Sequence, residues 1–125
     1  MPYSNVIDLF QRAEVKNGIG FVPAALGILI SLIGIMNMKG NISSLHWYHR
    51  SRVKEEDRLP FGRKVGLGTI IIGCAVILNA CSEFAYIKTG NPVLQFYGGV
   101  IPACGLGAGL ILIVCAMVRY NKGIF

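Results

Sequence analysis

The sequence has little charge. Asp, Glu, Lys and Arg make up 14% of its 125 residues, hydrophobic residues make up 54%, and the mean hydropathy is +0.58. Soluble globular domains carry about 25% charged residues. The composition therefore excludes an ordinary soluble domain and indicates an integral membrane protein.

Other scarcities limit the chemistry. Two His residues are too few for a zinc site, which takes three or four ligands. No Cys-x-x-Cys pair is present to support thiol exchange, and we interpret Cys74, Cys81, Cys104 and Cys115 as small packing residues. Because the chain also lacks a nucleophile–base pair, we expect no enzyme activity, no cofactor and no metal.

Three stretches contain no Asp, Glu, Lys or Arg. About 20 helical residues cross a hydrocarbon core of about 30 Å, and each stretch approaches or exceeds that length. The first apolar run begins too late and is too long for a signal peptide. We therefore predict an all-α membrane protein with a single transmembrane domain, residues 1–125, and with three transmembrane helices near residues 19–38, 65–87 and 93–118.

The positions of the basic residues predict the orientation, because Lys and Arg beside membrane spans favour the cytoplasmic side. Most of them lie in the inner loop, residues 39–64, or follow the third span, whereas the opposite side has only Arg12, Lys16 and Lys88. We expect the N-terminus outside and the loop and the C-terminus in the cytoplasm. Since these residues flank spans and mix with acids, they indicate membrane orientation and attraction to anionic headgroups rather than nucleic-acid binding.

Two further helices are predicted outside the spans. Apolar residues recur at helical spacing after Ser4, which predicts an N-terminal amphipathic helix in the interface. In the inner loop, Ser43 or Ser44 can begin a helix that runs to Glu56 and stops at Leu59-Pro60. Its Trp47 and Tyr48 are typical of a cytoplasmic interfacial helix.

The same loop carries two polar groups of interest. His46 and His49 share a helical face, which we interpret as interfacial packing or a surface pair that titrates near neutrality. Glu55, Glu56 and Asp57 belong to a mixed-charge cluster whose ion pairs contribute little if the cluster is simply solvated. The alternative is a surface that docks a partner or recruits a substrate.

Asn79 and Glu83 are the most informative residues in the spans, because they are four residues apart and so share one helical face. Ionisable groups inside membranes are costly to keep. Pro102 lacks an amide hydrogen and obstructs the carbonyl of Gly98, so we predict a kinked, broken third helix at a similar depth. Together, Glu83, Asn79 and Pro102 form a candidate ion or substrate path; alternatively, Glu83 simply reaches water near the headgroups.

Small residues recur in steps of four and three along each span, and such stripes let membrane helices approach closely. We expect three tightly packed helices with enough small surface left for self-association. The stripes comprise Gly20, Ala24, Gly27, Ser31 and Gly34 in the first span, Gly62, Gly66, Thr69, Gly73 and Ala80 in the second, and Gly98, Pro102, Gly105, Gly109 and Ala116 in the third.

The acidic run Glu55–Asp57 before Pro60-Phe61-Gly62, followed by Gly66-x-Gly68 and Gly73, resembles small, uncharacterised three-span bacterial integral membrane proteins, some of which are similar in layout to peptide-toxin immunity proteins. Size and topology are also similar to three-span phage holins, although we expect a shorter inner loop in those. Neither resemblance assigns a role to any residue.

Two functions fit this sequence. One is an oligomeric transport or channel-type subunit that uses Glu83 near the outer membrane boundary. The alternative is a non-catalytic immunity, scaffold or regulatory membrane protein. The expected partners are the lipid bilayer and either a second copy of the chain or another membrane protein.

Overall fold

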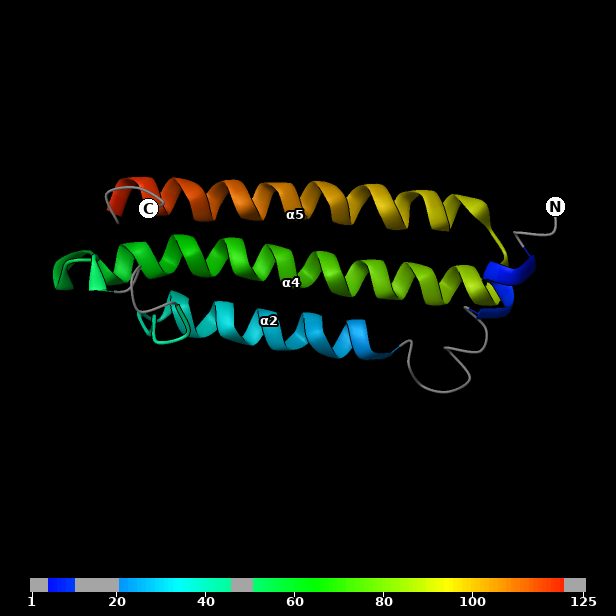
Figure 1. The fold of residues 1–125 in the computed structure, drawn as a ribbon, viewed down its shortest axis with the longest axis horizontal. Coiled ribbons are helices and arrows are strands. Elements are labelled where there is room, and N and C mark those ends of the chain that lie inside the picture. The colour runs from blue at the N-terminus through cyan, green and yellow to red at the C-terminus, as the bar shows by residue number, and fades with distance from the viewer. Residues whose placement is uncertain (1–4, 11–20, 46–50, 121–125) are drawn as a thin grey trace.

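The chain folds into long helices that lie side by side (Figure 1). The computed structural model describes residues 5–10, 21–45 and 51–120, and these contain no β-strand. The all-helical class expected from the sequence is therefore confirmed. The described helices include α2 (Val22–Met38), η2 (Glu55–Asp57, a single 3-10 turn), α4 (Arg58–Thr89) and α5 (Pro92–Tyr120).

The three long helices form a row with α4 in the middle. α4 packs along both α2 and α5, and these two outer helices have no comparable contact with each other. The row has a loop end, where residues 39–57 connect α2 to α4, and a turn end, where α4 meets α5 (Figure 1). Because the outer helices lie on opposite sides of α4, two faces of α4 remain open along the row.

The ends of α2 and α4 and both bounds of α5 lie within two residues of the predicted spans, but α4 starts earlier than expected. The sequence placed a stop at Leu59-Pro60 and the second span at Val65, but α4 begins at Arg58. That stop is wrong because Pro60 lies in the first turn of α4, where a helix needs no amide hydrogen from it. The first charged turns, including Arg63 and Lys64, therefore belong to the same rigid helix as the apolar segment.

The inner-loop helix predicted to run to Glu56 is also wrong in its second half. The chain leaves helical geometry after Ser51, and Lys54 is extended, with φ −63° and ψ 150°. His46 and His49 lie outside the described residues. At the N-terminus, residues 5–10 are helical, and the rest of the predicted amphipathic helix lies outside the described residues.

The turn between α4 and α5 is short because Gly90 adopts a left-handed conformation, with φ 69°. Its backbone N–H donates a hydrogen bond of 2.7 Å to the carbonyl of Tyr86, which ends α4. Asn91 Oδ1 then accepts a 3.0 Å hydrogen bond from the N–H of Val93 and caps α5. This tight connection fixes the antiparallel register of the two helices.

A buried apolar core closes the loop end. Phe61 is fully buried and meets the ring of Tyr120 edge-on at a centroid distance of 6.3 Å. Asn37 is also buried, and its Oδ1 accepts a 2.9 Å hydrogen bond from the hydroxyl of Ser44, so its polarity is matched. The buried apolar members of this core are Ile42, Val53, Phe61, Val65 and Ala116.

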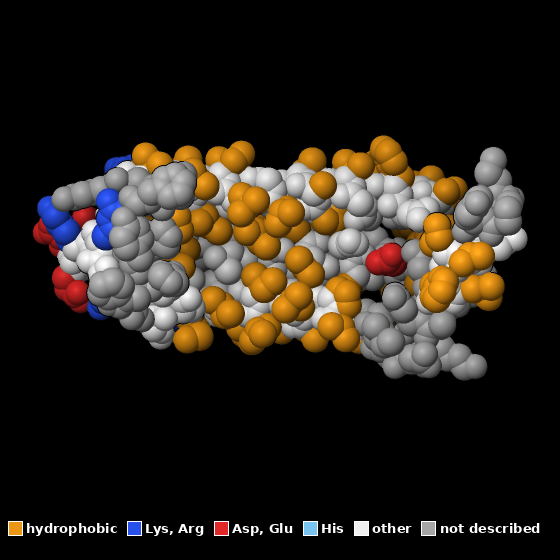
Figure 2. Space-filling view, in the orientation of Figure 1, with side chains coloured by type: hydrophobic (Ala, Val, Ile, Leu, Met, Phe, Trp, Pro, Cys, Tyr) orange, Lys and Arg blue, Asp and Glu red, His pale blue; other side chains and the backbone are white. Residues whose placement is uncertain are grey.

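Away from that core, the apolar residues of the helices lie mostly on the surface. Only 28% of the most apolar part of α4 and 17% of that of α5 is buried. Figure 2 shows hydrophobic side chains over the body of the molecule, Lys and Arg side chains gathered at the loop end, and an acidic group toward the turn end. Both helices are long and apolar enough to cross a membrane, and α2 is a shorter apolar helix; a core helix of a soluble protein would be buried instead.

Candidate functional site

The α2–α4 contact is built from backbone against backbone. An ideal Cβ added to Gly27 would lie 2.8 Å from the carbonyl oxygen of Gly73, and one added to Gly34 would lie 2.8 Å from that of Gly66. Ser31 donates a 2.9 Å hydrogen bond to the carbonyl of Gly27, so its hydroxyl is satisfied within α2. These five residues of the predicted stripes therefore face the partner helix, where no larger side chain fits without a shift.

The α4–α5 contact is equally close. A Cβ on Gly109 would lie 2.6 Å from the carbonyl oxygen of Gly68, and one on Gly105 would lie 3.0 Å from Cβ of Ala75. Farther along, Gly98 faces Ser82. Gly105 and Gly109 therefore pack inside this chain. Self-association through them remains a prediction, and these two residues leave less surface free for it than the sequence suggested.

This second contact uses a face of α4 that the sequence analysis missed. A single stripe was expected on each span, but a central helix needs two. The second stripe repeats every seven residues along α4, a spacing that was readable in the sequence: its members are Gly68, Ala75 and Ser82.

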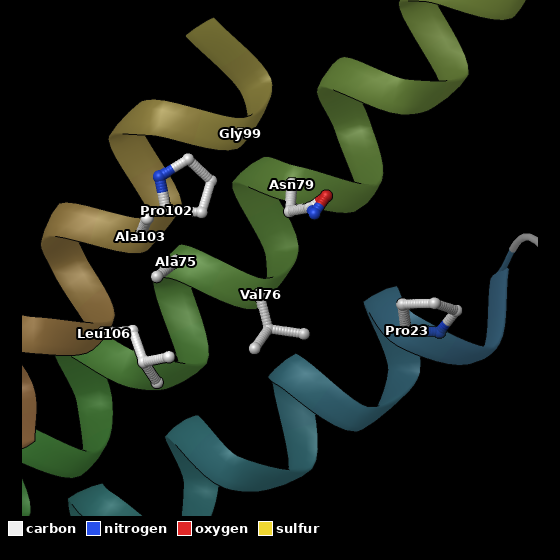
Figure 3. A pocket seen from close by; sticks show the side chains of 8 residues that line it. All are labelled: Pro23, Ala75, Val76, Asn79, Gly99, Pro102, Ala103 and Leu106. Carbon is white, nitrogen blue, oxygen red and sulfur yellow. The ribbon is translucent and has the colours of Figure 1, made fainter. Parts of the chain in front are cut away.

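A groove follows one open face of α4 at the turn-end half of the row. Its first part is a cavity of about 290 Å³ that all three long helices line: Pro23 from α2, Val76 and Asn79 from α4, and Pro102 and Leu106 from α5. Figure 3 shows Asn79 and Val76 between Pro102 on one side and Pro23 on the other. The walls are mostly apolar, because Asn79 supplies the one polar side chain among the lining residues.

The second part of the groove is a cavity of about 190 Å³ closer to the turn end. It shares Asn79 and Gly99 with the first part, and its further lining includes Glu83 and Gln95. A carboxyl and two amides therefore gather at one end of a groove whose other end is apolar. Hereafter the two cavities together are called the α4 groove.

The candidate path residues Glu83, Asn79 and Pro102 all line the α4 groove. The predicted break at Pro102 does not occur, since α5 is one helix from Pro92 to Tyr120. The close contacts of Gly98 with Ser82 and of Gly105 with Ala75, one on each side of the proline, hold α5 against α4. The site therefore has no unwound segment, although Pro102 within the continuous helix still cannot donate to the carbonyl of Gly98.

Polarity does not continue along the groove toward the loop end. Helical spacing places Ile72, Thr69 and Val65 after Val76 on the same face of α4. The Thr69 hydroxyl donates a 2.8 Å hydrogen bond to the carbonyl of Val65, so it is satisfied within the helix. The described part of this face is therefore polar at the turn end and apolar beyond it.

The acidic residues of the loop end lie apart from the groove. Glu55, Glu56 and Asp57 form η2, directly before α4, where negative charge interacts favourably with the helix dipole. Glu55 pairs with Arg58 at 3.1 Å, but its side chain is 82% exposed, and such surface pairs contribute little.

The described residues hold no group of three His, Cys, Asp or Glu that could bind a metal ion. All four cysteines are free thiols on the surface of α4 and α5. Comparison with known proteins found no matching family model, no matching curated protein and no matching solved structure.

Proposed function

We propose that this chain is a non-catalytic membrane protein whose α4 groove binds an apolar peptide segment carrying a basic residue. The observation that supports this function is the polarity of the groove, with Glu83, Asn79 and Gln95 at one end and Val76, Pro102 and Leu106 farther in. This is the behaviour expected of an immunity, scaffold or regulatory protein.

The proposal places all three long helices across a membrane. α4 and α5 have 32 and 29 residues, about 48 and 44 Å at 1.5 Å per residue, which exceeds a hydrocarbon core of about 30 Å. α2 has 17 residues, about 26 Å, and would need residues before Val22 to complete a span. Basic residues at the loop end would place that end in the cytoplasm and the polar end of the groove near the outer boundary.

The occupant follows from charge and from the shape of the groove. The first cavity is lined by α2, α4 and α5, and the second by α4 and α5, so an occupant would enter from the side of the row. A carboxylate with two neighbouring amides complements a Lys or Arg side chain, and the pairing is strengthened where water is scarce. The apolar part then takes the hydrocarbon body of the segment, as ligand sites commonly do.

Two glycines of α5 provide a matched test. An added Cβ at Gly99 or at Gly107 would meet no atom within 4 Å, so a larger residue is tolerated at either position. Gly99 lines both cavities, whereas Gly107 lines neither. Gly99→Leu should therefore fill the groove, while Gly107→Leu changes the same helix elsewhere.

The assay uses the protein in liposomes and a fluorescent Leu-Ala transmembrane peptide with one Lys near its outer end, followed by energy transfer. The parent and Gly107→Leu should bind this peptide more tightly than its Gln counterpart, and Gly99→Leu should bind neither well. Glu83→Gln should remove the preference for Lys. Equal binding by Gly99→Leu and Gly107→Leu would contradict the proposal.

A transport or channel-type subunit is the second candidate, because Asn79 and Glu83 share one groove. Two copies with their open faces together would convert two grooves into an enclosed space. Liposomes should then show a cation or proton flux that Glu83→Gln abolishes without unfolding the protein. If the parent protein carries no flux of any of several ions tested, the transport function is refuted and the binding function is favoured.

A further inference from the structure

The loop end carries two cationic groups at a single aromatic ring. Lys64 Nζ lies 5.5 Å from the centroid of the Tyr120 ring, and Arg119 Cζ lies 5.4 Å from it. Lys64 belongs to α4, whereas Arg119 and Tyr120 belong to α5. Cationic groups from both helices therefore lie at the same ring, where each gains from the negative face of the ring.

The ring is held in place by the core of the loop end. Tyr120 meets the fully buried Phe61 edge-on, with an interplanar angle of 73°, and packs against the buried apolar cluster. Its position is therefore fixed by packing, so Lys64 and Arg119 gather around a rigid platform. Such a cluster is organised before any ligand arrives, which lowers the entropy cost of binding.

The charge around this platform favours an anionic ligand. Among residues 5–10, 21–45 and 51–120, Glu55 pairs with Arg58, and no acidic partner of Lys64 or Arg119 is found there. The acidic residues Glu55, Glu56 and Asp57 precede the first turn of α4, and it is Glu55 of these three that pairs with Arg58. Two cations at one ring, neither with an acidic partner among the described residues, favour a ligand that carries a phosphate group.

Apolar surface begins beside the two cations. Leu67 is one helical turn beyond Lys64 and is 44% exposed, and Val118 directly precedes Arg119 and is 58% exposed. Leu67, Cys74, Leu78 and Cys81 follow Lys64 on one open face of α4 by helical spacing, and they are exposed. A ligand with a phosphate at one end and hydrocarbon at the other would match both features.

We propose that Lys64, Arg119 and Tyr120 form a binding site for the headgroup of an anionic phospholipid, whose acyl chain lies along the open face of α4 that carries Leu67. This site rests on the membrane placement of α4 and α5 but is independent of the α4 groove, which lies on another face and at the turn end. It holds a lipid at the cytoplasmic end of the row and fixes the depth of both helices.

The test follows thermal unfolding in a nonionic detergent during titration with dioctanoyl phosphatidylglycerol. Each basic residue near an anionic lipid surface contributes about a factor of five in affinity. Lys64→Gln/Arg119→Gln should therefore require about 30-fold more lipid for the same rise in Tm. The matched control is Lys39→Gln/Lys54→Gln, which removes the same charge from exposed positions that do not contact Tyr120 and should leave the titration nearly unchanged.

Three further results test whether the site binds a phospholipid. Dioctanoyl phosphatidylcholine and inorganic phosphate should each raise Tm much less than phosphatidylglycerol, and an equal effect of phosphate would identify a plain anion site instead. An equal loss in both double variants would reduce the effect to general positive charge and overturn the proposal. If the first double variant does not fold, Lys64→Gln alone should still weaken the lipid effect about fivefold, and no weakening would refute the site.

Discussion

Replacing Gly109 by Ala should destabilise the row of helices, whereas the same change at Gly107 should not. The two glycines are two residues apart on α5, so both substitutions gain the same helix propensity, about 1 kcal/mol. Gly109 faces α4, and an ideal Cβ there would lie 2.6 Å from the carbonyl oxygen of Gly68, while a Cβ at Gly107 would meet nothing within 4 Å.

The size of the effect follows from that contact. Non-bonded carbon atoms prefer separations of about 3.5 Å, so a methyl group at Gly109 would force α4 and α5 apart locally by roughly 0.9 Å. A gap of about 0.5–1 Å forfeits a quarter to a half of the dispersion energy of each atom pair across it. Overpacking of this kind costs about 1–3 kcal/mol, and this is the expected difference in unfolding free energy between the two variants.

The measurement is unfolding in mixed detergent micelles, followed by circular dichroism, for the parent and both variants. Gly107→Ala should be as stable as the parent or slightly more stable, and Gly109→Ala should unfold earlier. Equal stability of the two variants would mean that the backbones of α4 and α5 do not approach closely at Gly68, and the packing scheme based on small residues would then be wrong.

Two further predictions concern the loop end and the orientation. Phe61→Ala should lower the unfolding free energy by about 3–5 kcal/mol, because Phe61 is fully buried beneath Tyr120; a loss no larger than that of Leu59→Ala, at a position that is 44% exposed, would contradict the buried core. In a background without native cysteines, Arg52→Cys should react with a membrane-impermeant maleimide only after lysis and Lys88→Cys without it, and labelling of both from the same side would remove the three-span placement.

The helix bounds could be predicted from the sequence because charge is a local property. A stretch without Asp, Glu, Lys or Arg is visible residue by residue, and the span predicted from it, 93–118, lies within two residues of Pro92 and Tyr120. The start of α4 was misplaced because a proline such as Pro60 is compatible with two structures. A proline can follow the end of one helix, but it is also favoured in the first turn of the next. Nothing local decides between them.

The arrangement of the helices was harder to predict, because it depends on which surfaces meet. The stripe through Gly66 and Gly73 was recognised, while Gly68 was interpreted only as part of the entry to the second span. A row with α4 in the centre requires a second small face on that helix, and its heptad spacing through Ala75 and Ser82 becomes meaningful only once the central position is known. The joint position of Asn79 and Glu83 was predictable, since four residues separate them, but Gln95 reaches the groove only through the antiparallel turn at Gly90.

The row also limits how the chain can meet a partner. Both glycine faces of α4 are used within the molecule, so a contact with a partner would involve an open face or an outer helix. A second copy that occupied the α4 groove face to face would bring Glu83 close to its own counterpart, and two carboxyls so placed cannot both be ionised without strong repulsion. A segment with a basic residue meets no such cost, because its charge complements the carboxylate. On this physical ground, a basic partner fits the groove better than a symmetric pair of identical chains.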